Sequence, residues 1–218
     1  MKKFLVFLGL FLGLFVVVAQ KVYAFDIVPQ FVSMVYTNTL GLYQAPNDIV
    51  LYQQPDESSP VVDNIKWNKT TIDPNTVNAQ DLFVVYLPQK NLGFMAVIDE
   101  NENWVQVIYN NSTGDAGWIK KDDPYRFMTW INFYNIYARK YGLKMLSGVE
   151  DEVKNIHIAA DEYSKIIGTV NMPQKINLHA IKGNWALVSV YDLDRRSKTG
   201  YIRWRSEDGV KYFFPDIQ

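Results

Sequence analysis

Two segments of this 218-residue chain repeat the same pattern. Residues 103–109 and 184–191 both begin with Asn-Trp and then alternate apolar with polar positions, as β-strands with one buried face do. Each is followed by a polar loop and by a second strand that opens with Gly-aromatic-Ile-basic, at residues 117–120 and 200–203. Each copy therefore predicts a β-hairpin.

The repeat extends upstream of these hairpins. Residues 55–62 match residues 160–167 at a displacement of 105, whereas the two tryptophans are displaced by 81. The first copy therefore carries 24 extra residues between these landmarks, and we place most of them within residues 64–80, which are rich in turn formers. Two ordered matches indicate a duplication, so we expect two similar β domains.

The segment between the copies predicts the one strong helix of the chain. Asp123 suits the N-cap, Pro124 the first helical position, and Gly142 the C-terminal stop. One face carries Phe127, Trp130, Ile131, Tyr134, Ala138 and Tyr141, and further apolar residues lie off that face, namely Met128, Phe133, Ile136 and Tyr137. We expect this helix to be buried on more than one side, wedged between the copies, and we expect deletion of residues 124–141 to unfold both.

Short alternating strands with one strong helix are typical of small antiparallel barrels. We therefore predict a mainly β fold, in which two small antiparallel β-barrels are joined by one aromatic-rich α-helix. The first domain spans residues 25–122, the linking helix residues 123–143, and the second domain residues 144–218.

The N-terminus is typical of a secretory signal peptide. Lys2 and Lys3 precede an uncharged apolar run over residues 4–19, and small residues precede a cleavage site after Ala24. The run is shorter than the 18 or more apolar residues typical of a spanning helix. We predict an extracytoplasmic protein, periplasmic or secreted, with an uncleaved N-terminal anchor as the alternative.

The order of these motifs resembles the bacterial SH3-like (SH3b) domain family. The shared order is a Pro/Asp/Glu/Ser turn, a pair of Val or Ile, Asn-Trp-x-x-Val and Gly-aromatic-Ile, over residues 50–120 and 156–203. The resemblance implies two SH3-like barrels that act as adaptors for peptidoglycan peptides or envelope proteins. Two departures, the insertion and Asn103 and Asn184 in place of a frequent glycine, affect loops that bind ligand in the family, so specificity does not carry over.

The residue inventory argues against catalysis. The chain has no cysteine, and its two histidines, His157 and His179, fall in predicted strands without a nucleophile-elbow or zinc-peptidase motif. Residues 99–103 resemble the start of a calcium loop but lack its glycine, and the twelfth position is Asn110 where glutamate is required. The acidic pairs at residues 56–57 and 161–162 fit exposed turns better than acid–base catalysis. We predict a non-enzyme without cofactor or metal.

The candidate ligand-binding residues are aromatic side chains suited to peptide or glycan recognition, namely Trp104, Tyr109, Trp118, Trp185, Tyr191 and Tyr201. The alternative is that these rings fill small cores. A second candidate is a patch for an anionic partner, formed by Arg195, Arg196, Lys198, Arg203 and Arg205, with a solvated loop as its alternative.

The predicted function is that of an exported, non-catalytic binding module for peptide or peptidoglycan material. The alternative is a structural or protein-interaction subunit of a cell-envelope complex that docks through the aromatic helix. We expect no nucleic-acid partner, because the net charge of the whole chain is −1. Membrane contact is expected only through an uncleaved signal segment.

Overall fold

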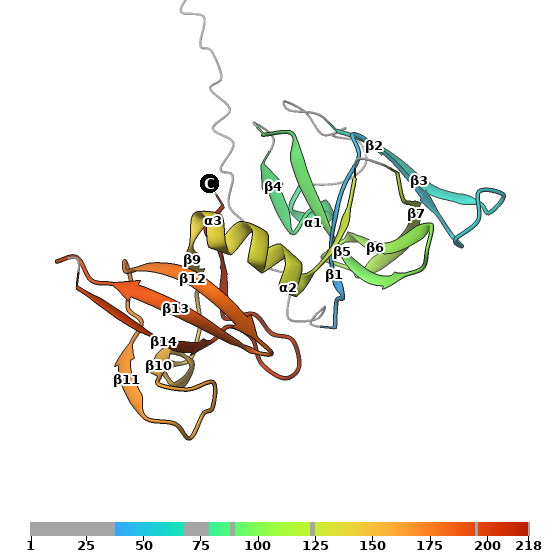
Figure 1. Cartoon of the computed structure of the whole chain (residues 1–218). Helices are drawn as coiled ribbons and strands as arrows, with labels where there is room; N and C mark the ends of the chain where they lie inside the picture. Colours follow the sequence, from blue (N-terminus) through green and yellow to red (C-terminus); the bar gives the residue numbers. More distant parts are fainter. Residues whose placement is uncertain (1–37, 68–78, 88–89, 123–124, 195, 218) are drawn as a thin grey trace, which may run out of the picture.

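The computed structural model describes residues 38–67, 79–87, 90–122, 125–194 and 196–217. Its strands form two antiparallel sheets, one from each copy of the repeat, with a helical segment between them (Figure 1). The prediction of a mainly β fold is confirmed. The predicted signal segment, its cleavage site after Ala24 and much of the predicted insertion lie outside the described residues.

The first sheet contains eight strands. In spatial order they are β3 (Val61–Lys66), β2 (Asp48–Tyr52), β7 (Asp115–Lys120), β6 (Trp104–Asn110), β5 (Leu92–Glu100), β1 (Gly41–Gln44) and β8 (Phe127–Thr129), and β4 (Val85–Leu87) pairs with β5 off this path. The second sheet contains seven, namely β11 (Ile166–Thr169), β10 (Asn155–His157), β14 (Ser197–Arg203), β13 (Trp185–Tyr191), β12 (Lys175–Lys182), β9 (Leu143–Met145) and β15 (Phe213–Pro215).

The two sheets have the same strand order. Without β4, the first sheet has seven strands, and the second sheet also has seven. Taken in chain order, β1, β2, β3, β5, β6, β7 and β8 occupy the same places in the first sheet as β9 to β15 occupy in the second. The two hairpins share their register at the start, because Trp104 lies opposite Lys120 in one and Trp185 opposite Arg203 in the other, and they differ after Ile108, where the first ladder has a bulge. This shared topology strongly supports the duplication that the sequence indicates.

The structure does not show the two closed barrels that the sequence predicts. In the part of the chain that the structure describes, β3 and β8 remain the edges of one sheet and β11 and β15 the edges of the other. The first sheet also carries the additional elements α1 (Ala79–Leu82) and β4, so the extra segment of the first copy extends beyond the predicted residues 64–80. A short 3-10 turn, η4 (Asp151–Lys154), precedes β10 in the second sheet.

The helix between the sheets is shorter than predicted. It runs without a break through α2 (Trp130–Phe133), the π-helical η3 (Tyr134–Ala138) and α3 (Arg139–Tyr141). Phe127 instead lies in β8, where it pairs with Tyr43. The N-cap is therefore Thr129, whose Oγ1 accepts a hydrogen bond from the backbone N–H of Asn132 at 3.3 Å. Asp123 and Pro124 lie outside the described residues.

The end of the helix agrees with the sequence. Gly142 caps it with φ of 89°, a conformation that glycine adopts far more readily than other residues. The predicted buried face is only partly correct, since Ile131 is 39% exposed whereas Phe133 is fully buried.

One hydrophobic core extends across both sheets through this helix. On one side the rings of Phe133 and Tyr137 contact Phe94 of β5, each at 5.6 Å between centroids. On the other side Tyr134 packs on Trp204 at 4.3 Å. The same buried cluster continues into the interior of the second sheet, whereas a second cluster belongs to the first sheet alone. The helix thus lies between the two copies in the way the sequence predicts.

Candidate functional site

An aromatic pair lies on the outer face of each sheet, which is the face opposite Val105 and Val107 in the first sheet and opposite Ala186 and Val188 in the second. In the first sheet, Tyr52 of β2 meets Trp104 of β6 edge to face, with ring centroids 5.4 Å apart. In the second sheet, His157 of β10 meets Trp185 of β13 in the same way at 5.2 Å. The strand between the two rings adds a third aromatic residue in each sheet. Trp118 of β7 lies opposite Tyr52, and Tyr201 of β14 lies opposite His157.

An ion pair borders each aromatic pair. Lys120 of β7 pairs with Glu57, and Arg203 of β14 pairs with Glu162 at 3.3 Å. In both copies the carboxylate comes from the loop of a hairpin, the β2–β3 hairpin in the first copy and the β10–β11 hairpin in the second. Glu57 and Glu162 are 105 positions apart in the sequence. The hydrogen bond from Lys120 to Glu57 raises the pKa of that lysine. We call these residues the outer-face clusters; the first comprises Tyr52, Glu57, Trp104, Trp118 and Lys120, and the second His157, Glu162, Trp185, Tyr201 and Arg203.

The loop that supplies each glutamate is folded by the same hydrogen bonds. The Asp56 carboxylate accepts from the N–H of Ser58 at 2.9 Å, and the Asp161 carboxylate accepts from the N–H of Tyr163 at 3.0 Å. The same bond lowers the pKa of Asp56. Both aspartates thus act as turn residues, which agrees with the sequence interpretation of the acidic pairs.

A glycine lets the strands beneath each cluster approach closely. A Cβ on Gly200 would lie 2.6 Å from the carbonyl oxygen of His157 and 2.7 Å from Cγ2 of Ile156. A Cβ on Gly117 would lie 3.2 Å from Leu51, which occupies the place of Ile156 in the first sheet. Packing therefore requires glycine at position 200, whereas at position 117 the Leu51 side chain would have to shift by a few tenths of an ångström.

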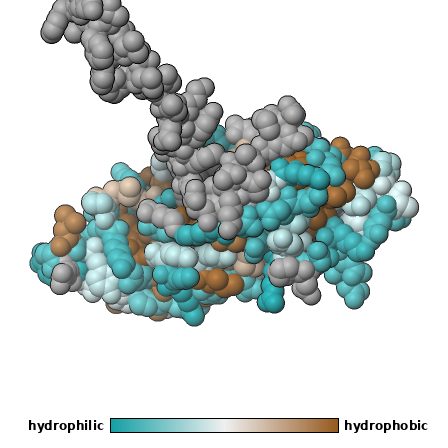
Figure 2. Space-filling view, turned by 90° about the horizontal axis from the view of Figure 1, so that it is seen from above, coloured by the Kyte–Doolittle hydropathy of each residue, from teal (hydrophilic) through white to brown (hydrophobic). Residues whose placement is uncertain are grey.

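The hairpin beside the second cluster exposes more apolar surface than its counterpart. Tyr163 is 90% exposed, Ile158 60% and Ile166 51%, all on the β10–β11 hairpin that carries Glu162. In the first hairpin Val61 and Val62 are exposed, whereas polar residues occupy the places of Ile158 and Tyr163. On the face seen in Figure 2, hydrophobic residues form separate patches on a mainly hydrophilic surface. Exposed apolar side chains beside half-buried aromatic rings are typical of recognition surfaces.

Four of the six predicted aromatic residues belong to the outer-face clusters, and two do not. Trp104, Trp118, Trp185 and Tyr201 are members, although Trp104 is nearly buried. Tyr109 sits at a bulge in β6 and packs against the inner core of the first sheet. Tyr191 lies at the opposite end of β13 from Trp185.

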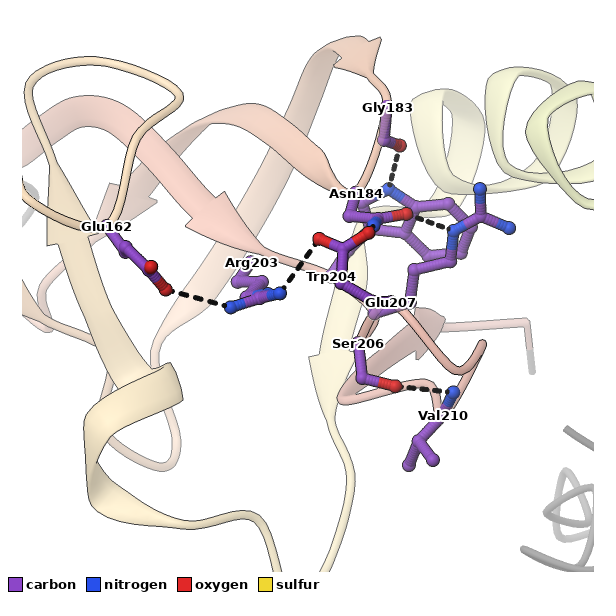
Figure 3. A network of polar contacts seen from close by, with 9 residues as sticks. Glu162, Gly183, Asn184, Arg203, Trp204, Ser206, Glu207 and Val210 are labelled. Atoms are coloured by element: carbon purple, nitrogen blue, oxygen red, sulfur yellow. Dashed lines mark hydrogen bonds and ion pairs between the residues drawn. The ribbon is translucent and has the colours of Figure 1, made fainter.

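The predicted basic patch is divided between the two ends of β14. Arg196 pairs with Asp194 at 2.5 Å near the hairpin tip, together with Lys198, whereas Arg203 and Arg205 lie at the other end of the strand. Figure 3 shows Arg203 between two carboxylates, Glu162 and Glu207. Arg195 lies outside the described residues. These contacts are not those of a single basic patch.

Sequence reasoning did not single out Tyr52, His157 or the two glutamates as site residues. The sequence does contain a signal for these residues, namely their equivalent positions in the two copies. Tyr52 and His157 are displaced by 105, as are Glu57 and Glu162, so alignment of the copies places each pair at equivalent positions. The equivalence of Tyr52 and His157 is difficult to recognise from residue type, because tyrosine and histidine share only an aromatic ring with a polar edge.

The two histidines make hydrogen bonds in the second sheet, and no carboxylate of the described residues is a partner of either ring. His179 Nε2 lies 2.8 Å from Ser189 Oγ, which is 2.7 Å from Thr199 Oγ1, and His157 Nδ1 lies 3.2 Å from the carbonyl oxygen of Ser164. A serine-type triad needs a carboxylate on the second ring nitrogen. Among the described residues, no three potential ligand side chains gather at a possible metal site.

The segment that resembles a calcium loop forms a hairpin turn between β5 and β6. Asn101 Oδ1 accepts hydrogen bonds from the N–H groups of Asn103 and Trp104, at 3.0 Å and 2.9 Å. This side-chain acceptor closes the turn and places Trp104 at the first position of β6.

The chain matches no protein-family model and no curated protein sequence. Within the described ranges, no helix is long and apolar enough to cross a membrane.

Proposed function

We propose that this protein is an exported, non-catalytic binding module that recognises peptide or peptidoglycan material with its outer-face clusters. The observation that carries the proposal is the recurrence of the same aromatic pair, neighbouring ring and ion pair on both sheets. The tryptophans of the two pairs belong to neither hydrophobic cluster of the protein, although Trp104 and His157 are nearly buried. The signal segment and the motif order that resembles SH3-like domains support export and an adaptor role.

The second cluster is the better ligand site. The half-buried rings of Trp185 and Tyr201 offer rigid apolar faces, and the exposed side chains of the β10–β11 hairpin extend this surface. Strand β11 is an edge of its sheet, so an extended peptide has main-chain groups to pair with beside the rings. In the first copy, Trp104 is nearly buried and offers less ring surface.

The helix is less suited to docking than the outer faces. Its aromatic side chains pack between the sheets, and Ile131 and Ile136 are the exposed large apolar residues of the helix. We therefore place the ligand on the outer face of the second sheet rather than on the helix.

Retention of the chain, without residues 1–24, on purified peptidoglycan tests the proposal. We expect retention at low salt, and at least about tenfold weaker binding for Trp185→Ala, since a buried aromatic anchor contributes about 2 kcal/mol or more to an interface. Tyr191→Ala is the matched control, because it removes a half-buried ring from the far end of the same strand. Absence of retention, or equal binding by Trp185→Ala and wild type, contradicts the proposal.

A further inference from the structure

Two cationic side chains lie side by side where the second sheet meets the helix. Arg205 and Lys211 pair across an isolated antiparallel bridge, so their side chains leave the backbone toward the same side. Like charges directly opposite each other on neighbouring strands are destabilising. The placement of these two positive charges opposite each other therefore needs a physical reason, such as a bound negative charge.

Both cations lie over buried indole rings. Lys211 Nζ is 4.1 Å from the ring centroid of Trp130, and Arg205 Cζ is 4.8 Å from that of Trp204. Both indoles are almost completely buried, at 2% and 0% exposure. Burial, with a smaller contribution from the Arg205 charge, lowers the pKa of Lys211 to about 7. The rings hold the positions of the cations but supply no full negative charge to balance them.

The hydrogen-bonding capacity of the pair is largely unused. Arg205 donates from Nε to Asn184 Oδ1 at 2.6 Å, and this leaves its two terminal nitrogens and Lys211 Nζ without a protein acceptor among the described residues. No carboxylate of that part of the chain lies within ion-pair distance of either side chain. The fully buried unpartnered side-chain polar atoms there are Asn111 Oδ1 and Arg203 Nε, so the free donors of Arg205 and Lys211 reach solvent.

We propose that Arg205 and Lys211 form a binding site for an oxyanion, a carboxylate or a phosphate group. A guanidinium offers a planar pair of N–H donors and an ammonium offers three, which together suit a group with two or more oxygens. The bound charge offsets the repulsion between the two cations. The site lies next to the second outer-face cluster, because Asn184, which accepts a hydrogen bond from Arg205, also donates one to Glu207, the partner of Arg203 (Figure 3). It uses side chains outside that cluster and does not depend on the proposed peptide-binding function.

Calorimetric titration of the full chain at pH 6 with inorganic phosphate, and separately with acetate, tests this site. Lysine is protonated at that pH, and we expect binding of at least one of the two ions. Lys211→Met and Arg205→Gln should each weaken that binding at least about tenfold, whereas Lys198→Met, at the far end of β14, should not change it. Phosphate alone would identify a phosphate ligand, and acetate alone a carboxylate ligand.

A structural role for the pair would give a different result. The Lys211 side-chain resonances, followed by NMR in lysine-labelled protein, should titrate near pH 7 and shift to a higher midpoint when the anion binds. Three results would overturn the proposal. Neither ion binds, or the folded Lys211→Met variant binds the anion as wild type does, or the anion does not move the midpoint of the Lys211 titration.

Discussion

Single residues explain why the two copies resemble each other less in sequence than in structure. Trp104 and Trp185, with the glycines at 117 and 200, keep the same places in the sheets, and the sequence identifies them directly. Tyr52 and His157 also keep the same place, although they differ in kind. What is retained at that place is an aromatic edge against a tryptophan, a physical requirement that several residue types satisfy.

Substitution of Gly200 should destabilise the protein more than the same change at Gly117. An added methyl group at Gly200 meets the backbone oxygen of His157, which cannot move without disturbing the ladder, whereas at Gly117 it meets the side chain of Leu51. We expect Gly200→Ala to lower the free energy of unfolding by about 1–3 kcal/mol. Urea denaturation of both variants measures the difference, and an equal or larger loss in Gly117→Ala would contradict the packing argument.

The partly buried cation Lys211 should make stability depend on pH. Its pKa is about 7 in the folded chain against 10.5 ordinarily, so between these values the unfolded chain binds a proton that the folded chain does not. Stability therefore rises with pH from about 7 toward 10, by at most about 1.4 kcal/mol per pH unit, and the cost of the buried charge is fully present below about pH 7. Burial raises the pKa values of Tyr43 and Tyr134, so ionisation of these tyrosines in the unfolded chain opposes this trend above about pH 10.

Comparison with Lys211→Met isolates this effect. The variant should be more stable than wild type at pH 6, and the difference should shrink as the pH rises to 9.5. Denaturation midpoints at these two pH values, with Lys198→Met as the exposed-lysine control, provide the measurement. A stability difference that does not change with pH would show that Lys211 keeps its ordinary pKa.

At the scale of elements, the strands were more predictable than the helix boundary. Strict alternation at residues 103–109 and 184–191 predicts β6 and β13 because one face of each is buried. The helix start was misplaced because Phe127 fits the helical pattern equally well, and pairing of β8 with β1 decides its conformation. That pairing is a contact between residues more than 80 positions apart, which local periodicity does not report.

The candidate site was also predicted only in part from the sequence. The sequence placed four of the clustered aromatic residues, since they belong to repeated motifs. It selected Tyr109 as a ligand-binding candidate, although Tyr109 alternates with Val105 and Val107 and packs with them on the inner core of the first sheet. It grouped Arg196 with Arg203 because the two are near in sequence, although the length of β14 separates them. The ladder register that sets this distance becomes visible only in the folded sheet.

The helix should couple the stability of the two sheets. Phe133 is fully buried between them and contacts both Phe94 and Phe214. We expect Phe133→Ala to lower the unfolding free energy by about 3–5 kcal/mol and both sheets to unfold in one transition. Ile136→Ala, at a site 53% exposed, should change it by no more than about 0.5 kcal/mol. Two separate calorimetric transitions in the wild-type chain would contradict the shared core.

At the scale of the whole molecule, two topologically identical sheets enclose one helix and share part of a core. Each sheet carries its own outer-face cluster, with its own hairpin and ion pair. The copies also differ on these outer surfaces, where the second hairpin is more apolar and the second tryptophan more accessible. Such divergence is consistent with one copy specialised for the ligand and one for stability.

Hydrogen–deuterium exchange with and without soluble peptidoglycan fragments tests the binding surface most directly. We expect slower exchange in the β10–β11 hairpin and in the adjoining ends of β13 and β14, around Trp185 and Arg203. We expect no change at the tip of the β13–β14 hairpin, near Tyr191. Protection confined to the helix or to the first sheet, or no protection at a fragment concentration that saturates binding, would contradict the proposed binding surface.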